Sequence, residues 1–73
     1  MTLEDAQNAA RKAVQFDSQN QYKQALYYYN VAVKYLVELQ DPVYDQKISE
    51  YQKRITIIQK LSEYFKLAYD MYL

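Results

Sequence analysis

The chain has 73 residues, and its nine basic and nine acidic side chains give a formal net charge of zero. This length limits the protein to one small domain, 1–73, with a modest core. The absence of cysteine and histidine excludes disulfides, the usual zinc sites and histidine-based acid–base catalysis. We therefore expect no metal site, no cofactor and no enzymatic activity, and a reducing, cytoplasmic setting.

The charged residues are interspersed along the chain, as in the helical spacings of Lys34 with Glu38 and Glu50 with Arg54. This pattern differs from the basic clusters of nucleic-acid-binding proteins, so we expect no nucleic-acid partner. No apolar run approaches the roughly 20 residues of a membrane span, and the first ten residues lack a signal-peptide pattern. The sequence therefore predicts a soluble domain without direct membrane insertion.

A first helix is predicted over residues 3–19. Thr2 and Asp5 have the spacing of a capping box at its start. Asn20 is the best candidate for a left-handed residue at its end, because the chain lacks glycine. The apolar row of this helix consists mostly of small residues, which allow close approach of a neighbour: Leu3, Ala6, Ala9, Ala10, Ala13 and Phe16.

A second helix is predicted over residues 21–40, and it carries two apolar rows. The first row recurs at steps of three and four and predicts a buried face: Tyr22, Ala25, Leu26, Tyr29, Ala32, Val33 and Leu36. The second row is Tyr28, Val31, Tyr35 and Leu39. Two rows indicate a helix packed between two neighbours.

A third and longest helix is predicted over residues 42–70. Asp41 and Pro42 supply an N-cap side chain and a first-turn proline. The short connection favours an antiparallel hairpin with the second helix. Its core row is Tyr44, Ile48, Tyr51, Ile55, Ile58, Phe65, Tyr69 and Tyr72. The predicted fold is an all-α antiparallel three-helix bundle with a long third helix, whose aromatic C-terminal end is a candidate self-association surface.

A wider pattern resembles the MIT (microtubule-interacting and trafficking) domain over nearly the whole chain. The matching positions are Ala13, Asp17, Tyr22, Ala25, Leu26, Tyr29, Ala32, Val33, Ile48, Glu50, Tyr51 and Arg54. The third-helix segment is similar to modules of archaeal ESCRT-associated AAA ATPases, and residues 13–29 are similar to those of calpain-like proteases. The connection before the third helix is shorter than in many members.

The resemblance implies a non-catalytic adaptor that binds short motifs in the tails of ESCRT-III-type proteins. Such a module recruits its host protein to membrane-remodelling or cell-division filaments, which implies a cytoplasmic protein transiently at membranes. Hosts in the family include ATPases, proteases, kinases and sorting proteins, and for this chain the resemblance favours an AAA ATPase. Members of the family use two grooves. One, between the second and third helices, takes a leucine-rich helix, and the other, between the first and third helices, takes an extended peptide.

The groove between the second and third helices is the less favoured site in this chain. The resemblance places an apolar contact at Gln52 and acidic partners at Lys53 and Thr56, and all three features are missing. A polar wall recovers little of the free energy of leucine burial. The residues predicted for this alternative groove are Tyr28, Val31, Tyr35, Gln52 and Thr56.

The groove between the first and third helices is the favoured site for an extended peptide. Small Ala10 leaves room, Val14 and Ile57 supply apolar walls, and basic side chains are available for acidic residues of a ligand. The predicted lining is Gln7, Ala10, Arg11, Val14, Lys47, Glu50, Arg54, Ile57 and Leu61.

Simpler interpretations compete with each of these assignments. Most tyrosines fit an amphipathic core with the hydroxyl toward water, Arg54 is spaced to pair with Glu50, and Val14, Ile57 and Leu61 are apolar enough to bury against one another. The predicted fold is also TPR-like and spectrin-repeat-like, and the alternative function is a tetratricopeptide-like helical fragment or a self-associating structural module. A tetratricopeptide fragment would be unstable outside its array, whereas an MIT-like module would fold alone.

Overall fold

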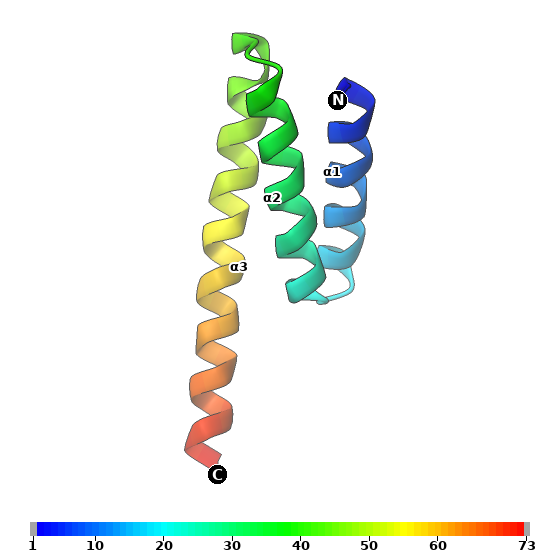
Figure 1. Cartoon of the computed structure of the whole chain (residues 1–73). Coiled ribbons are helices and arrows are strands. Elements are labelled where there is room, and N and C mark those ends of the chain that lie inside the picture. Colours follow the sequence, from blue (N-terminus) through cyan, green and yellow to red (C-terminus); the bar gives the residue numbers. More distant parts are fainter. Residues whose placement is uncertain (1, 73) are drawn as a thin grey trace.

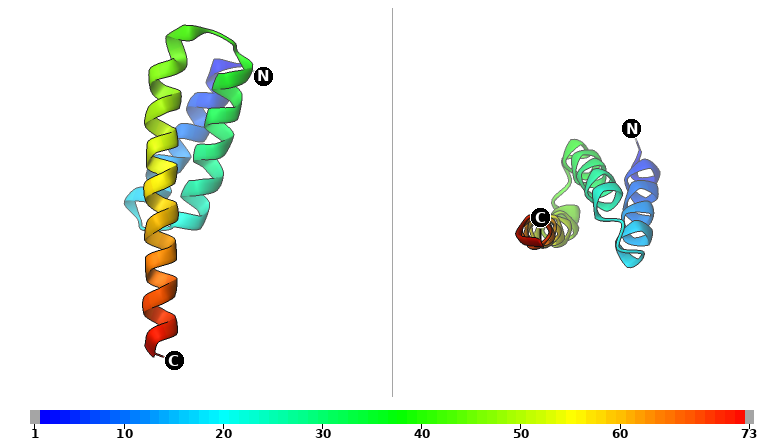
Figure 2. Two further views of the ribbon diagram at one scale, coloured as in Figure 1. Left: turned by 90° about the vertical axis from the view of Figure 1, so that its left-hand side faces the viewer. Right: turned by 90° about the horizontal axis from the view of Figure 1, so that it is seen from below.

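The computed structural model describes the backbone of residues 2–72 and the side chains of residues 2–64. It contains three helices, α1 (Leu3–Ser18), α2 (Tyr22–Glu38) and α3 (Asp45–Tyr72), with a short 3-10 turn, η1 (Pro42–Tyr44), in front of α3. Successive helices are antiparallel, so α1 and α3 run in the same direction, and α2 lies between them (Figure 1, Figure 2). The predicted all-α three-helix bundle with a long third helix is confirmed.

The ends of α1 are formed as the sequence predicts. The Thr2 hydroxyl accepts a hydrogen bond from the Asp5 N–H at 3.3 Å, and the Asp5 carboxylate accepts one from the Thr2 N–H at 3.1 Å. This reciprocal pair satisfies donors that the first helical turn leaves open. At the other end, Asn20 has φ 60, in the left-handed region, and the Gln21 N–H donates to the Phe16 carbonyl at 2.9 Å.

The connection between α2 and α3 differs in detail from the prediction. The Asp41 carboxylate accepts a hydrogen bond from the Val43 N–H at 3.0 Å, as an N-cap residue does. The following turn is a 3-10 helix, however, and α3 begins at Asp45 instead of 42. Gln40 has φ 55, which the sequence did not indicate. A chain without glycine reverses here by placing a longer side chain in the left-handed region, at some cost in backbone energy.

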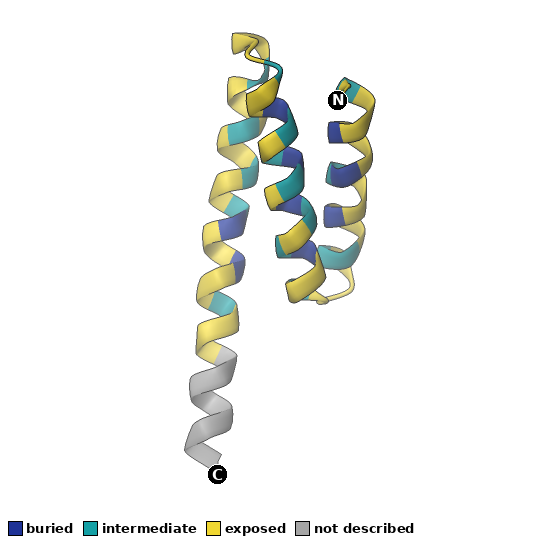
Figure 3. Ribbon diagram, in the orientation of Figure 1, coloured by how far each residue is buried: buried dark blue, intermediate teal, exposed yellow. Residues whose placement is uncertain are grey.

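The core lies where all three helices meet, near the α1–α2 turn. It is formed by Ala13, Ala25, Tyr29, Ile55 and Ile58. Small alanines on α1 and α2 let these two helices approach closely. Ile55 and Ile58 of α3 fill the space between α3 and the other two helices. Buried positions line the facing sides of α1 and α2 along most of their length (Figure 3). We call the end of the bundle with the α1–α2 turn the lower end, and the end with η1 the upper end.

The first apolar row of α2 is confirmed as the buried face, because Ala25, Tyr29, Ala32 and Leu36 are all buried. In the second row, Tyr28, Val31 and Tyr35 are half-buried and line a hollow between α1 and α2. The Phe16 ring stacks on the Tyr28 ring with centroids 5.6 Å apart and an interplanar angle of 12°. Stacking of this kind stabilises the contact beyond what the buried area of the two rings contributes.

The C-terminal part of α3 extends beyond the ends of α1 and α2 (Figure 1, Figure 2). Phe65, Tyr69 and Tyr72, and with them most of the candidate self-association surface, lie outside the residues whose side chains are described. Over the described residues, no helix combines the length and the apolar character that a membrane span requires.

Candidate functional site

A groove runs between α1 and α3 in the upper half of the bundle. Its main hollow, of about 240 Å³, is lined by Leu3, Ala6, Gln7, Ala10, Leu36, Tyr44, Lys47 and Tyr51. A second hollow shares Ala10 and Tyr51 with the first and adds Arg11 and Val14. Because two lining residues are common to both hollows, they form one continuous surface, which we call the α1/α3 groove.

The groove exists because α1 presents small side chains toward α3. Ala6 and Ala10 are one turn apart and face the larger Tyr44 and Tyr51. Alanine fills little of the space between the helices, and the buried Leu36 of α2 forms an apolar floor. The result is an apolar depression with a polar rim, open to solvent along its length.

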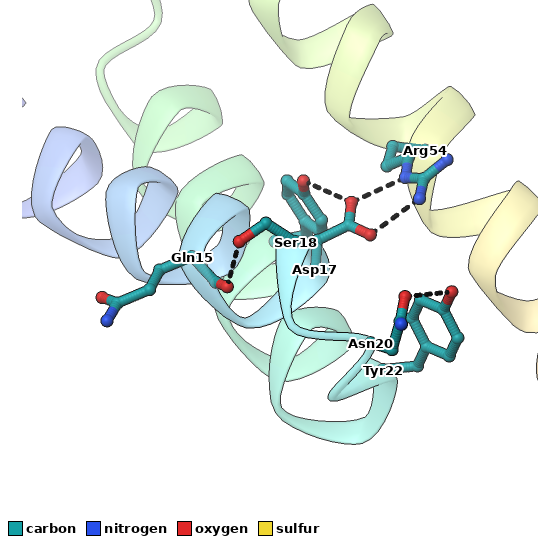
Figure 4. A network of polar contacts seen from close by, with 7 residues as sticks. Gln15, Asp17, Ser18, Asn20, Tyr22 and Arg54 are labelled. Carbon is teal, nitrogen blue, oxygen red and sulfur yellow. Dashed lines mark hydrogen bonds and ion pairs between the residues drawn. The ribbon is translucent and has the colours of Figure 1, made fainter.

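At the lower end of the groove, a polar cluster joins all three helices. Arg54 of α3 donates two hydrogen bonds to the Asp17 carboxylate of α1, from Nε at 2.6 Å and from Nη2 at 2.7 Å. The hydroxyl of Tyr29 on α2 donates to the same carboxylate at 2.9 Å. Figure 4 shows Arg54 reaching across to Asp17, near Asn20 in the α1–α2 turn and Tyr22 at the start of α2. A bidentate pair of this geometry fixes both the distance and the orientation of its partners.

The cluster keeps fixed protonation states at neutral pH. The hydrogen bond from Arg54 holds the pKa of Asp17 below its ordinary value of 3.8, although partial burial acts in the opposite direction. Burial raises the pKa of the Tyr29 hydroxyl from 10.0 to about 12, and its hydrogen bond to Asp17 adds to the effect. Asp17 is therefore a carboxylate, and its charge is balanced by Arg54.

Five of the residues predicted for this groove line it, namely Gln7, Ala10, Arg11, Val14 and Lys47. Val14 and Ile57 are 53% and 47% exposed, so neither is sealed inside the bundle. Lys47 forms an ion pair with Glu50 at 3.5 Å on the rim of the groove. The guanidinium of Arg11 donates to the Asn8 side chain and remains on the surface.

The remaining members of the predicted set have other positions. Arg54 pairs with Asp17 across the bundle, so the expected pairing with Glu50 is wrong. Ile57 and Leu61 follow Arg54 on α3 and line neither hollow. The structure therefore shortens the predicted groove to the part above Arg54.

Several lining residues were not predicted. Tyr44 and Tyr51 were assigned to the core row of the third helix, and Leu36 to that of the second. The available signal was a row on the first helix at steps of four and three: Leu3, Gln7, Ala10, Val14 and Asp17. This row meets a matching row on the third helix: Tyr44, Lys47, Tyr51 and Arg54.

The alternative groove between α2 and α3 is not formed by the predicted residues. Tyr28, Val31 and Tyr35 line a hollow between α1 and α2, together with Asp5, Asn8, Ala9, Lys12 and Tyr27. Lys12 Nζ lies 5.4 Å from the centroid of the Tyr28 ring. Gln52 and Thr56 are exposed on α3, where the Thr56 hydroxyl donates to the Gln52 carbonyl at 3.1 Å. The prediction failed because Phe16 stacks on Tyr28, which places α1 over this side of α2.

Among the described side chains, no group of three or more acidic, histidine or cysteine residues could hold a metal ion. Comparison with protein-family models, with curated proteins and with solved structures gives no match. The likeness to the MIT family therefore rests on the pattern of residues in the sequence.

Proposed function

We propose that this domain is a non-catalytic interaction module that binds a short, extended peptide in the α1/α3 groove. By its resemblance to MIT domains, the peptide would come from the tail of an ESCRT-III-type protein. The module would thus bring a host protein, in this proposal an AAA ATPase, from the cytoplasm to membrane-remodelling or cell-division filaments.

The observation that carries the proposal is the open apolar groove between two parallel helices. Val14 lies at its edge with about half of its surface exposed, and the hollow beside it is unfilled in a domain that otherwise packs its small side chains closely. At about 240 Å³ the main hollow is smaller than a usual small-molecule site of roughly 300–1,000 Å³. Its size suits one or two side chains of a peptide.

The geometry favours an extended ligand over a helical one. A helix is about 10 Å across with its side chains, whereas Asp17 and Arg54 hold α1 and α3 within the reach of two side chains at the lower end of the groove. The side chains predicted to line a groove for a leucine-rich helix also do not lie together, because Tyr28, Val31 and Tyr35 line a hollow next to α1 instead of α3. A ligand that contacts only this short groove buries less than a standard interface, so we expect weak binding.

The test is a binding competition on the isolated, 15N-labelled domain. Two peptides with the character of ESCRT-III-type tails are compared: an extended, proline-containing acidic peptide and a leucine-rich amphipathic helix. We expect the extended peptide to bind and to shift the amide resonances of Gln7, Ala10 and Tyr51. Preference for the helical peptide would contradict the proposal.

A pair of leucine substitutions makes this test specific. Ala10→Leu places a larger side chain in the groove and should weaken binding about tenfold or more, since the filled space can no longer take a ligand side chain. Gln15→Leu adds a leucine to an exposed position of the same helix, outside the hollows, and serves as the matched control. Equal affinities for the two variants would show that the peptide binds elsewhere.

A further inference from the structure

The two ends of the α1/α3 groove differ in structure. At the upper end it opens beside Leu3 and Tyr44, where the chain enters α1 and leaves η1. At the lower end the same two rows of residues meet at Asp17 and Arg54, which are linked by two short hydrogen bonds. The side chain of Asp17 is only 11% exposed and that of Arg54 is 39% exposed, so the pair spans from the interior to the surface of the gap between the helices.

We infer that the Asp17–Arg54 pair is the end wall of the groove and limits the bound segment to about six extended residues. The inference rests on the proposed peptide-binding function and adds the length and position of the ligand. Leu3 and Asp17 are 14 positions apart on α1, which corresponds to about 21 Å at 1.5 Å per residue. An extended peptide advances about 3.3 Å per residue, so this length holds about six residues.

The charge of the lining defines the chemistry of the ligand. The two charged residues that line the hollows, Arg11 and Lys47, are both basic. Glu50 contacts Lys47, but the two side chains are 49% and 63% exposed, and a surface pair of this kind is easily exchanged for another partner. The end wall adds no net charge, because Asp17 and Arg54 balance each other. The occupant is therefore an extended peptide with apolar side chains and at least one acidic residue.

The wall is also rigid enough to act as a stop. Tyr29, which is buried, donates to the Asp17 carboxylate and fixes it from the side of α2. A ligand would have to break charge-assisted hydrogen bonds at 2.6 and 2.7 Å in order to pass between α1 and α3. Below the wall, α3 presents Ile57, which is 47% exposed, and the half-buried Leu61, which a longer ligand could contact only by passing the wall.

The experiment measures affinity against peptide length. The probes are synthetic peptides of one, two, three and four Leu-Pro-Glu repeats, in which proline keeps the chain extended. For the wild-type domain we expect affinity to rise about fivefold or more from one to two repeats. Beyond two repeats, affinity should rise only because a longer peptide offers more positions at which the same short segment can bind. The double variant Asp17→Asn, Arg54→Ala removes the wall without leaving an unpaired charge, and the introduced amide retains an acceptor for the Tyr29 hydroxyl. Its affinity should continue to rise about threefold or more beyond two repeats.

Two controls separate the wall from a general loosening of the bundle. The charge swap Asp17→Arg, Arg54→Asp keeps a bridge between the same positions and should retain the wild-type dependence on length. For the wild-type domain itself, the four-repeat peptide should shift the amide resonances of Gln7 and Tyr51 but not that of Ile57. This last measurement is independent of whether either variant folds.

The outcomes distinguish the two claims. If no peptide of any length binds, the proposed function fails and the end wall fails with it. If the peptides bind in the groove but the wild type and the Asp17→Asn, Arg54→Ala variant depend equally on length, or if Ile57 responds in the wild type, the function stands and the end wall is wrong.

Discussion

The two ends of the bundle use similar small side chains with opposite results. At the lower end, Ala13 and Ala25 are completely buried and belong to one core cluster with Ile55 and Ile58. At the upper end, Ala10 is only half-buried and borders an open hollow with Leu36 as its floor.

The difference lies in what the third helix contributes. Branched aliphatic side chains of α3 fill the lower interface, and the ion pair of Arg54 with Asp17 links α3 to α1. At the upper interface, α3 contributes Tyr44, Lys47 and Tyr51, which border the gap without filling it. The lower end therefore provides stability and the upper end provides accessible surface, and mutations should affect the two ends differently.

The largest expected effect is at Ile58, which is the largest completely buried side chain among residues 2–64. Ile58→Ala removes three carbons from the lower core and should lower the free energy of unfolding by about 2–4 kcal/mol. Ile57→Ala makes the same chemical change at a neighbouring position that is 47% exposed, and should cost less than about 1 kcal/mol. Urea denaturation of both variants measures the contrast, and equal costs would refute the assignment of the core.

The next effect concerns the pH dependence of the unfolding free energy, to which Tyr29 contributes at the lower end. Its pKa is raised from 10.0 to about 12, so folding favours the neutral hydroxyl. The corresponding stability is complete below pH 10 and is lost as the pH rises from about 10 to about 12, and it amounts to about 2–3 kcal/mol.

Tyr29→Phe removes this ionisation and keeps the ring, so the difference in unfolding free energy between wild type and variant isolates the contribution of Tyr29. All other side chains are common to the two proteins, so their contributions cancel in the comparison. Denaturation curves at pH 9 and at pH 12 should therefore show the wild type losing more stability than the variant, and parallel losses would mean that the hydroxyl is not held by Asp17 and burial.

A smaller effect is expected from breaking the ion pair of the lower end. Arg54→Ala leaves the largely buried Asp17 carboxylate with Tyr29 as its remaining partner and should cost about 1–2 kcal/mol, a value reduced by the partial exposure of Arg54. The matched control is Lys47→Ala, which breaks the exposed pair with Glu50 and should cost less than about 0.5 kcal/mol. A double-mutant cycle with Asp17→Asn gives the coupling energy, which should vanish if the two side chains do not interact in solution.

The smallest effect concerns the connection at the upper end, where Gln40 has φ 55. Gln40→Gly relieves the left-handed strain of a longer side chain but increases the freedom of the unfolded chain, so the net stabilisation should be about 0.5 kcal/mol. Gln52→Gly, at an exposed position inside α3, should instead destabilise by about 1 kcal/mol. Thermal unfolding midpoints that shift in opposite directions would support the strain at Gln40, whereas two losses would contradict it.

Features that depend on near neighbours in the chain were predictable. The capping box of Thr2 and Asp5, the left-handed Asn20 and the Asp41 cap each involve residues within a few positions of one another. The helical periodicities predicted three helices and the buried face of α2. The α1 side of the groove was also predicted in part, since Gln7, Ala10, Arg11 and Val14 follow from the spacing along one helix.

Features that depend on how one helix is rotated against another were not predictable. Arg54 has Glu50 one turn away on its own helix, yet it pairs with Asp17, 37 positions earlier. Tyr28 was assigned to the side of α3, but the stacking of Phe16 brings α1 over it. In both cases the periodicity of a single helix permits two neighbours, and the choice depends on packing of the other helices.

The sequence by itself thus determined the number of helices, their approximate ends and the faces that must be buried, because these follow from hydrogen bonding and hydrophobic spacing over a few residues. Only the tertiary structure decided that Asp17, Tyr29 and Arg54 meet, and that Ala10 and Tyr51 border one groove between α1 and α3. The physical reason is that the rotation of each helix about its axis is set by the sum of many contacts with the other two, and no single segment carries that information.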